Sequence, residues 1–299
     1  MSQNPDSSKS PEVPIEFDMN MFAIGAGMFM LAQIIGILVG FLNLKLPVFA
    51  ETMEVSASVG SFLIAFLIAT VILISLIKFV KGKWLFKIML AAMMFIGTEM
   101  VLTTFIPQIF GITFAIALVI LRFVHPTVFL QNAVMTLAIA GIGARIGLIL
   151  PVDAVIIILI VLSIYDYIAV YKTKHMVKMF KNLISRNVPL SLIVPTKLEG
   201  MKAKVDDASP GKDKKGKRKF MMLGTGDIAF PVIFAVAAAR HSLFSGIAVI
   251  FGAFFGIIAV YSILINSKKG AIPALPPIAA CTIIAFILSI MVEFLAVLF

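Results

Sequence analysis

The sequence has few charged residues and almost no cysteine. Charged residues make up 13% of the 299 residues, against about a quarter in an average soluble domain. Hydrophobic residues make up 61%, and the mean hydropathy is +1.10. A soluble fold cannot bury this much apolar surface, so we expect lipid to surround most of the chain. The single cysteine, Cys281, excludes an intramolecular disulfide framework and any zinc or iron–sulfur site built on cysteines.

Two signatures of membrane-embedded hydrolases are also missing. The sequence contains no H-E-x-x-H motif, which excludes the zincin form of metalloprotease. Its three histidines, His125, His175 and His241, all lie at the ends of apolar segments. None of them is therefore placed to activate a serine nucleophile inside the membrane. We expect neither a metal nor a cofactor.

Positive charge is concentrated in one hydrophilic segment. Of the 25 Lys and Arg residues, 14 lie between Lys172 and Lys219. The net charge of +10 could suggest a nucleic-acid partner, but clustering in one loop between apolar segments is typical of a cytoplasmic loop of a membrane protein. We therefore expect no nucleic-acid partner, and we expect this segment to contact anionic membrane lipids.

Nine stretches are long and apolar enough to cross about 30 Å of hydrocarbon as helices. They are residues 19–42, 58–79, 84–104, 108–124, 128–147, 152–171, 221–240, 244–265 and 275–298. The predicted fold class is therefore an all-α polytopic membrane protein with nine transmembrane helices. Residues 19–171 would hold the first six helices and residues 221–299 the last three.

The distribution of Lys and Arg predicts the orientation. One side of the membrane would carry 22 of them, counting the residues that flank each span, and the other side only Lys45, Arg145 and Arg240. The positive-inside rule then places the N-terminus in the cytoplasm and Phe299 on the extracytoplasmic side. The expected location is the cell membrane, with the segment between the sixth and seventh helices in the cytoplasm.

The hydrophilic segments differ in character. Residues 1–18 have no basic n-region and no small-residue cleavage site, so we expect a disordered tail rather than a signal peptide. Residues 172–220 form the basic cytoplasmic loop. Within it, apolar residues at helical spacing from Met176 to Ile184 suit either an amphipathic helix on lipid or a continuation of the sixth helix. Residues 200–219 are rich in Lys, Asp and Gly, which predicts a mobile segment.

Ionisable residues within spans are costly in lipid and mark functional sites by default. Asp166 lies six residues before Lys172, and Asp227 lies eight residues after Lys219. At the helical rise per residue these positions are roughly 9 and 12 Å below the same membrane face. The two helices are consecutive and antiparallel, so the carboxylates can face each other. The remaining acids in apolar segments lie toward the outer ends of their spans, where a structural or boundary role is expected; they are Glu99, Asp153 and Glu293.

Two facing carboxylates in a low-dielectric site cannot both ionise easily, so they share one proton and titrate as a unit. Aspartic proteases use this arrangement. The ionised carboxylate accepts a proton from the attacking water, and the protonated one donates to the peptide carbonyl. The alternatives are a structural pair that holds two helices together, or a secondary transporter or channel that uses the two aspartates as a proton or cation site.

Two local patterns sharpen this choice. Gly224 and Gly226 weaken the start of the seventh helix and let another backbone approach closely, so we place both among the residues that shape the site. Three prolines in five residues, Pro273 to Pro277, predict an irregular or extended stretch that enters the membrane from the same face as the aspartates. Irregular backbone at that depth must be buried in protein or line a wet cavity.

With these motifs the chain resembles the presenilin and signal peptide peptidase family of intramembrane aspartyl (GxGD) proteases. The resemblance rests on Tyr165-Asp166, Gly224-Thr225-Gly226-Asp227 and Pro273-Ala274-Leu275, and it covers residues 19–299. Prepilin peptidases share a G-x-G-D run, but they follow it with a lysine where this chain has Ala229. The inferred cytoplasmic N-terminus favours the presenilin branch, and the short loop favours a compact single-chain enzyme of archaeal type.

The resemblance implies an aspartic endopeptidase that hydrolyses peptide bonds within transmembrane helices, so its partners would be transmembrane protein substrates. It assigns Asp166 and Asp227 as the catalytic pair. It further implies that Tyr165 borders the active site and that Pro273, Ala274 and Leu275 shape the substrate cleft. Thr225 stands where presenilins usually carry leucine, which leaves the cleavage-site preference open. The sequence also leaves open a homo-oligomer and a catalytically silent protein that only binds transmembrane helices.

A helical substrate must be unwound before it can be cleaved, and its freed backbone groups then need partners. The run Phe220-Met221-Met222-Leu223 and the Pro273 region are the candidates. We expect them to pair with the unwound segment as a strand.

Overall fold

The computed structural model describes residues 19–44, 83–171, 190–208, 220–266 and 272–298, together with isolated positions between 60 and 72. The predicted tail (residues 1–18) and the predicted amphipathic helix within 172–189 lie outside the described residues, as does most of the predicted span 58–79.

The described part of the chain is mostly helical. Six helices are long and apolar enough to cross a membrane, and a seventh, of 17 residues, is apolar but shorter. The helices are α1 (Met19–Leu44), α4 (Lys83–Phe105), α5 (Gln108–Val124), α6 (Val128–Ile149), α7 (Val152–Tyr171), α9 (Thr225–His241), α10 (Leu243–Asn266) and α11 (Leu275–Leu298). They lie within two residues of the predicted limits, except at the start of α9.

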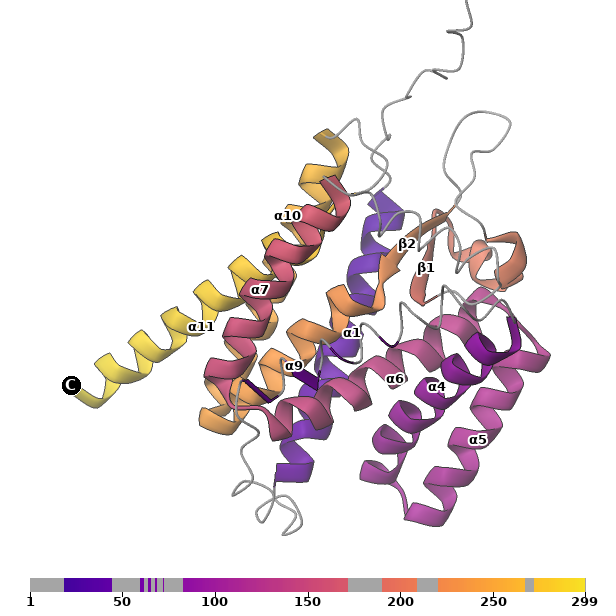
Figure 1. Ribbon diagram of the computed structural model, residues 1–299, viewed down its shortest axis with the longest axis horizontal. Helices are drawn as coiled ribbons and strands as arrows, with labels where there is room; N and C mark the ends of the chain where they lie inside the picture. The colour runs from indigo at the N-terminus through magenta and orange to yellow at the C-terminus, as the bar shows by residue number, and fades with distance from the viewer. Residues whose placement is uncertain are drawn as a thin grey trace, which may run out of the picture.

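Helices α6 and α9 lie at the centre of the bundle beside α1, with α4 and α5 on one side and α7, α10 and α11 on the other (Figure 1). Small residues allow α4 and α6 to approach closely. A Cβ atom on Gly97 of α4 would collide with the backbone of Ala138 in α6, and one on Gly141 would collide with the backbone of Gly97. Such contacts are typical of helix pairs in membranes, where van der Waals packing replaces the hydrophobic effect.

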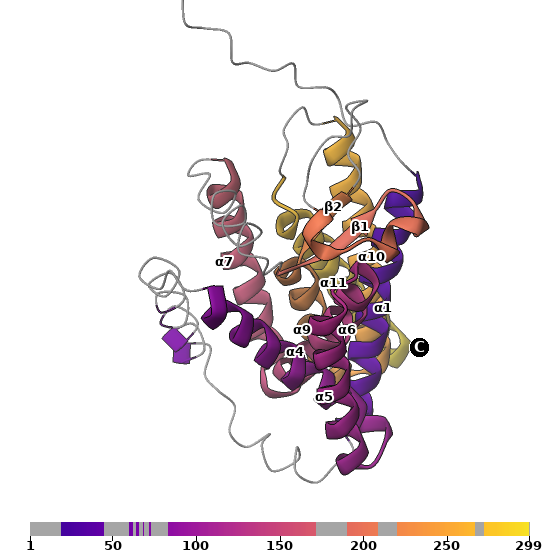
Figure 2. The same cartoon turned by 90° about the vertical axis from the view of Figure 1, so that its right-hand side faces the viewer.

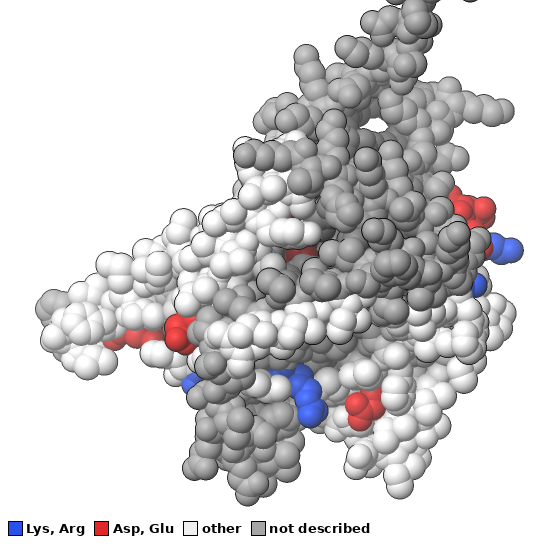
Figure 3. All heavy atoms as spheres, in the orientation of Figure 1, with Lys and Arg blue, Asp and Glu red and all other residues white. Residues whose placement is uncertain are grey.

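The outer surface fits a lipid environment. On the face shown in Figure 3, the charged side chains of the described residues form small, separate patches on an otherwise uncharged surface. Helix α11 is an example, because residues such as Ile287, Leu288 and Phe294 are at least half exposed. The composition is therefore explained by apolar side chains on the outside as well as in the core.

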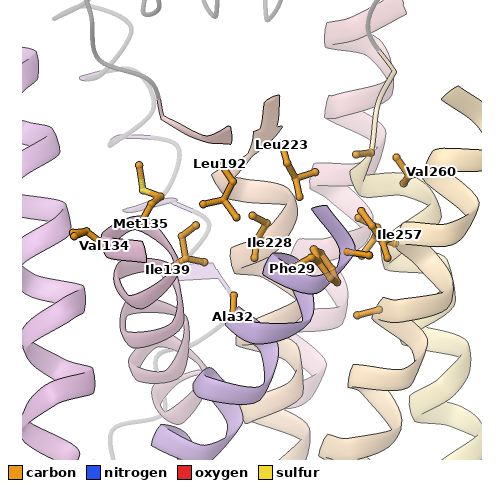
Figure 4. Packing of buried hydrophobic residues seen from close by; sticks show 14 of the residues in the cluster. Phe29, Ala32, Val134, Met135, Ile139, Leu192, Leu223, Ile228, Ile257 and Val260 are labelled. Carbon is orange, nitrogen blue, oxygen red and sulfur yellow. The ribbon is translucent and has the colours of Figure 1, made fainter. Parts of the chain in front are cut away.

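One hydrophobic cluster lies between the helices and a small sheet. It joins Phe29 of α1, Ile139 of α6, Ile228 of α9 and Ile257 of α10 (Figure 4). Leu192 and Leu223, one from each strand of the sheet, belong to the same cluster. The sheet therefore packs against the helices through its own side chains.

The sheet is the main departure from the predicted all-helical fold. Strands β1 (Ser191–Pro195) and β2 (Phe220–Gly224) are antiparallel, with Ile193 opposite Met222, and they lie toward one end of the bundle (Figure 2). The predicted helix 221–240 therefore begins only at Thr225. The prediction that residues 220–223 are extended is confirmed.

The polar segment after β1 is folded against the turn between α5 and α6. It contains two 3-10 helices, η1 (Leu198–Lys202) and η2 (Val205–Asp207). The N–H of Val128 donates to the carbonyl of Ala203 at 2.9 Å, and the N–H of Val205 donates to the carbonyl of Pro126 at 2.8 Å. The prediction of a mobile segment is therefore wrong for residues 200–207, because backbone hydrogen bonds and the burial of Val205 hold them.

The proline-rich stretch also differs from the prediction. Residues 272–274 are non-helical, as expected, but Pro276 and Pro277 lie in the first turn of α11. Backbone N–H groups in a first helical turn have no partner within the helix, so proline costs little there. The prediction that all three prolines are irregular is wrong for these two.

Candidate active site

Asp166 projects from α7 into the protein. Its side chain is buried, with the residue only 6% exposed, although both neighbouring positions on the helix, Tyr165 and Tyr167, are 52% exposed. Burying a carboxylate without a partner in a nonpolar environment is costly, so its surroundings must supply hydrogen-bond donors or other polar partners.

One partner of Asp166 comes from the start of α11. The backbone N–H of Leu275 donates to Oδ2 of Asp166 at 3.3 Å. Because Pro273, Pro276 and Pro277 have no N–H group, Leu275 and Ala274 supply the only backbone donors over these five residues. The motif therefore offers few backbone donors, and the donor of Leu275 reaches the carboxylate from the positive end of a helix.

Pro273, Ala274 and Leu275 are all buried. The side chain of Leu275 belongs to a hydrophobic cluster that includes Phe234 of α9 and Ala279 of α11. Leu275 thus has two separate functions in the structure. Its side chain packs α11 against α9, and its N–H group holds Asp166.

Asp227 lies in the first turn of α9, directly after β2, and is half-buried. Its carboxylate turns back toward Gly224, because a Cβ atom on Gly224 would lie 2.9 Å from Oδ2 of Asp227. A Cβ atom on Gly226 would meet nothing closer than Phe230 at 3.8 Å. Of the two glycines in the G-x-G-D run, only Gly224 is therefore in close contact with the carboxylate.

The structure brings Asp166 and Asp227 together. Helix α7 packs against both α9 and α11, and the two carboxylates are near enough to interact electrostatically. Two like charges within electrostatic range disfavour ionisation of both carboxyl groups at once. Tyr165, in contrast, lies on the exposed surface of α7. Among the residues that the structure describes, no group of three or more His, Cys, Asp or Glu side chains could hold a metal ion.

Two buried amides near the site were not predicted from the sequence. Gln33 of α1 is fully buried and donates through Nε2 to the carbonyl of Ile228, the residue after Asp227, at 3.1 Å. Asn132 of α6 bonds to both backbone polar groups of Ile193 in β1. An amide within an apolar stretch is the only signal in the sequence, and amides are also common at ordinary helix contacts in membranes.

Comparison with known proteins gives a consistent result. A family model described as "Signal-peptide peptidase, presenilin aspartyl protease" matches residues 22–295. Two solved structures, of a presenilin family intramembrane aspartate protease in the C222 and P2 space groups, are similar in fold. The first has a TM-score of 0.57 at 19% identity and covers 88% of this chain and 94% of its own. The second has a TM-score of 0.59 at 18% identity and covers 92% of this chain and 97% of its own. No curated protein matches the sequence.

Proposed function

Because the chain belongs to the family of signal-peptide peptidase and presenilin aspartyl proteases, and is therefore an intramembrane aspartyl protease, we propose that Asp166 and Asp227 are its catalytic pair. The single observation that supports this assignment is that the packing of α7 against α9 places the two carboxylates within electrostatic range of each other. The alternative of a transporter or channel is set aside, because the family is one of proteases.

The pair would act by general acid and base catalysis. One carboxylate, ionised, accepts a proton from water as the water oxygen attacks the peptide carbonyl carbon. The other, protonated, donates its proton to the carbonyl oxygen, and this gives a neutral tetrahedral diol. The peptide C–N bond then breaks as the carboxyl group that took the water proton gives it to the amine nitrogen. The other, now ionised, takes a proton from a diol hydroxyl, which leaves a carboxylic acid and restores the pair. The N–H of Leu275 would keep the Asp166 carboxyl group oriented throughout.

Transmembrane proteins are the substrates that this activity implies, and their helices must be unwound at the cut. We propose that the unwound segment pairs with β2. Ile193 stands opposite Met222, but its backbone N–H and C=O bond to Asn132 and not to β2. Ile193 and Met222 thus form a non-hydrogen-bonded pair, so the polar groups of Met222 also point away from β1. They would be available to a substrate strand.

The proposed topology has nine transmembrane helices, with the N-terminus and the basic segment 172–219 in the cytoplasm and Phe299 outside. It is supported by the distribution of 22 against 3 basic residues and the positive-inside rule. A cysteine introduced at Ser2 should react with a membrane-impermeant reagent only after the cells are opened. Reaction in intact cells would show that the N-terminus lies outside, opposite to the proposed orientation.

The catalytic assignment is tested with the purified protein in detergent and a single-span helical substrate. Mass spectrometry should find peptide products with the parent protein and none with Asp166→Ala or Asp227→Ala. General acid and base catalysis contributes about 100- to 10,000-fold, so residual activity should be undetectable in this assay. Thermal melts of both variants should match the parent protein. Cleavage by either folded variant would refute the assignment.

A further inference from the structure

Asn132 fills the place of a third strand beside β1. Its Nδ2 donates to the carbonyl of Ile193 at 2.7 Å, and its Oδ1 accepts from the N–H of Ile193 at 2.8 Å. A side-chain amide carries the same donor and acceptor as a peptide group. Asn132 therefore satisfies Ile193 as a neighbouring strand would, but from a helix.

The amide is held on several sides. The residue is 3% exposed, and Nδ2 also lies 3.9 Å from Sδ of Met28 in α1 and 3.7 Å from Sδ of Met201 in η1. Thioether sulfurs are weak acceptors, so the bonds to Ile193 decide the orientation of the amide. Since α6 is the most buried of the candidate spans among the described residues, Asn132 fixes β1 to the buried centre of the bundle.

This anchor has a direct path to the active site. Strand β1 pairs with β2, in which Gly224 is the last residue, and Asp227 follows three residues later in the first turn of α9. A two-stranded sheet is marginally stable by itself, so its position depends on what holds it. The segment after β1 is held by the hydrogen bonds from Val128 to Ala203 and from Val205 to Pro126, whereas Asn132 holds the strand itself.

We propose that Asn132 is a positioning residue that sets which peptide bond is cut. It would do so by fixing the β1–β2 sheet relative to Asp227. This inference rests on the proposed pairing of substrate with β2. A substrate strand aligned on a fixed edge presents one bond to the aspartates, whereas a loosened edge presents several.

The test compares the products that full-length variants make from one single-span substrate, measured by mass spectrometry. Asn132→Ala removes both bonds to Ile193. Asn132→Asp keeps the acceptor but places a second acceptor against the Ile193 carbonyl. In both variants the ratio of the main cut to neighbouring cuts should fall at least threefold, whatever happens to total turnover.

Asn43→Ala is the matched control. Asn43 also uses its amide to link two helices, donating to Oγ1 of Thr104 in α4 at 2.9 Å. Gly25, near Val194 of β1, lies 18 residues earlier on the same helix, so Asn43 is about 27 Å farther along α1. Its loss can lower stability and total turnover, but it should leave the product ratio unchanged.

The proposal is overturned if Asn132→Ala or Asn132→Asp cleaves with the product ratio of the parent protein. It is also overturned if both variants fold, as judged by thermal melting, but do not cleave at all, because Asn132 would then maintain the site as a whole and not the register. Absence of products from the parent protein would count against the proposed function instead.

Discussion

The two ends of α9 both carry polar side chains, but they use them differently. At its start, the carboxylates of Asp166 and Asp227 lie within electrostatic range of each other, and the N–H of Leu275 donates to Asp166. At its end, polar groups of different kinds form hydrogen bonds with one another. Arg240 donates to the carbonyl of Leu150 at 3.0 Å, and Ser242 donates to Glu293 of α11.

We infer from this difference that the start of α9 serves the chemistry and its end serves the stability of the fold. Complementary partners lower the cost of burying polar groups, so the end near Ser242 ties α9, α10 and α11 together. Like partners raise that cost, and a fold retains such a pair only where chemistry requires it. Changes at the start of α9 should therefore alter activity more than stability, and changes at its end should do the reverse.

Among changes that keep both aspartates, the largest effect is expected when the donor to Asp166 is removed. Leu275→Pro deletes this N–H group at the first position of α11, where proline is well tolerated. Leu275→Ala loses the buried side chain as Leu275→Pro does, but it keeps the N–H group. Loss of a hydrogen bond to a charged group is expected to lower the rate about 10- to 100-fold. Cleavage by Leu275→Pro should be lower than that by Leu275→Ala by this factor.

Thermal melts provide the control for this pair. Both variants lose the packing of Leu275 in its cluster, so both should melt below the parent protein by similar amounts. Activity is then compared at a temperature at which both are folded. Equal cleavage rates would mean that the N–H of Leu275 does not orient Asp166 for catalysis.

A smaller effect is expected from the glycines before Asp227. An alanine at position 224 would bring Cβ to 2.9 Å from Oδ2 of Asp227, whereas at position 226 the nearest atom is 3.8 Å away. The backbone of Gly224 has φ −63° and ψ 139°, which alanine adopts without strain. The carboxylate can rotate away from the new methyl group, so the fold tolerates Gly224→Ala but the geometry of the pair does not.

Gly224→Ala should therefore reduce cleavage by about tenfold, the equivalent of roughly 1.4 kcal/mol, with little change in melting temperature. Gly226→Ala should stay within about twofold of the parent protein, because its methyl group makes only an ordinary van der Waals contact with Phe230 and alanine favours the helix. Initial rates on a single-span substrate measure both. If Gly226→Ala were the more damaging change, a substrate contact and not the carboxylate would explain this glycine.

The helices and the aspartate pair could be predicted from the sequence because their signals are local. Apolar length predicts a membrane helix, and the spacing of Asp166 and Asp227 from the basic segment predicts a similar depth for both. The pairing of β1 with β2 is not local, since Ile193 and Met222 are 29 residues apart. Ser191–Pro195 therefore looked like part of a polar loop. The exposure of Tyr165 was also hidden, because a continuously apolar helix such as α7 has no polar face that would indicate its orientation.

The smallest effect on cleavage is expected at the end of α9. Glu293 accepts a hydrogen bond from Ser242, and its Oε2 lies 3.8 Å from Nδ1 of His241, which agrees with the structural role predicted for it. Glu293→Ala should lower the free energy of unfolding by about 1–2 kcal/mol, because it leaves the Ser242 hydroxyl without this acceptor. Glu293→Gln keeps an acceptor oxygen and should lose less.

Cleavage at a temperature well below the melting point should be unchanged in both Glu293 variants, since α9 separates this end from Asp227 by 14 residues, or about 21 Å. Thermal melts and initial rates on the same preparations separate the two effects. A fall in rate without a fall in melting temperature would show that the two ends of α9 are coupled. Polar groups that satisfy one another would then serve the active site as well as the fold.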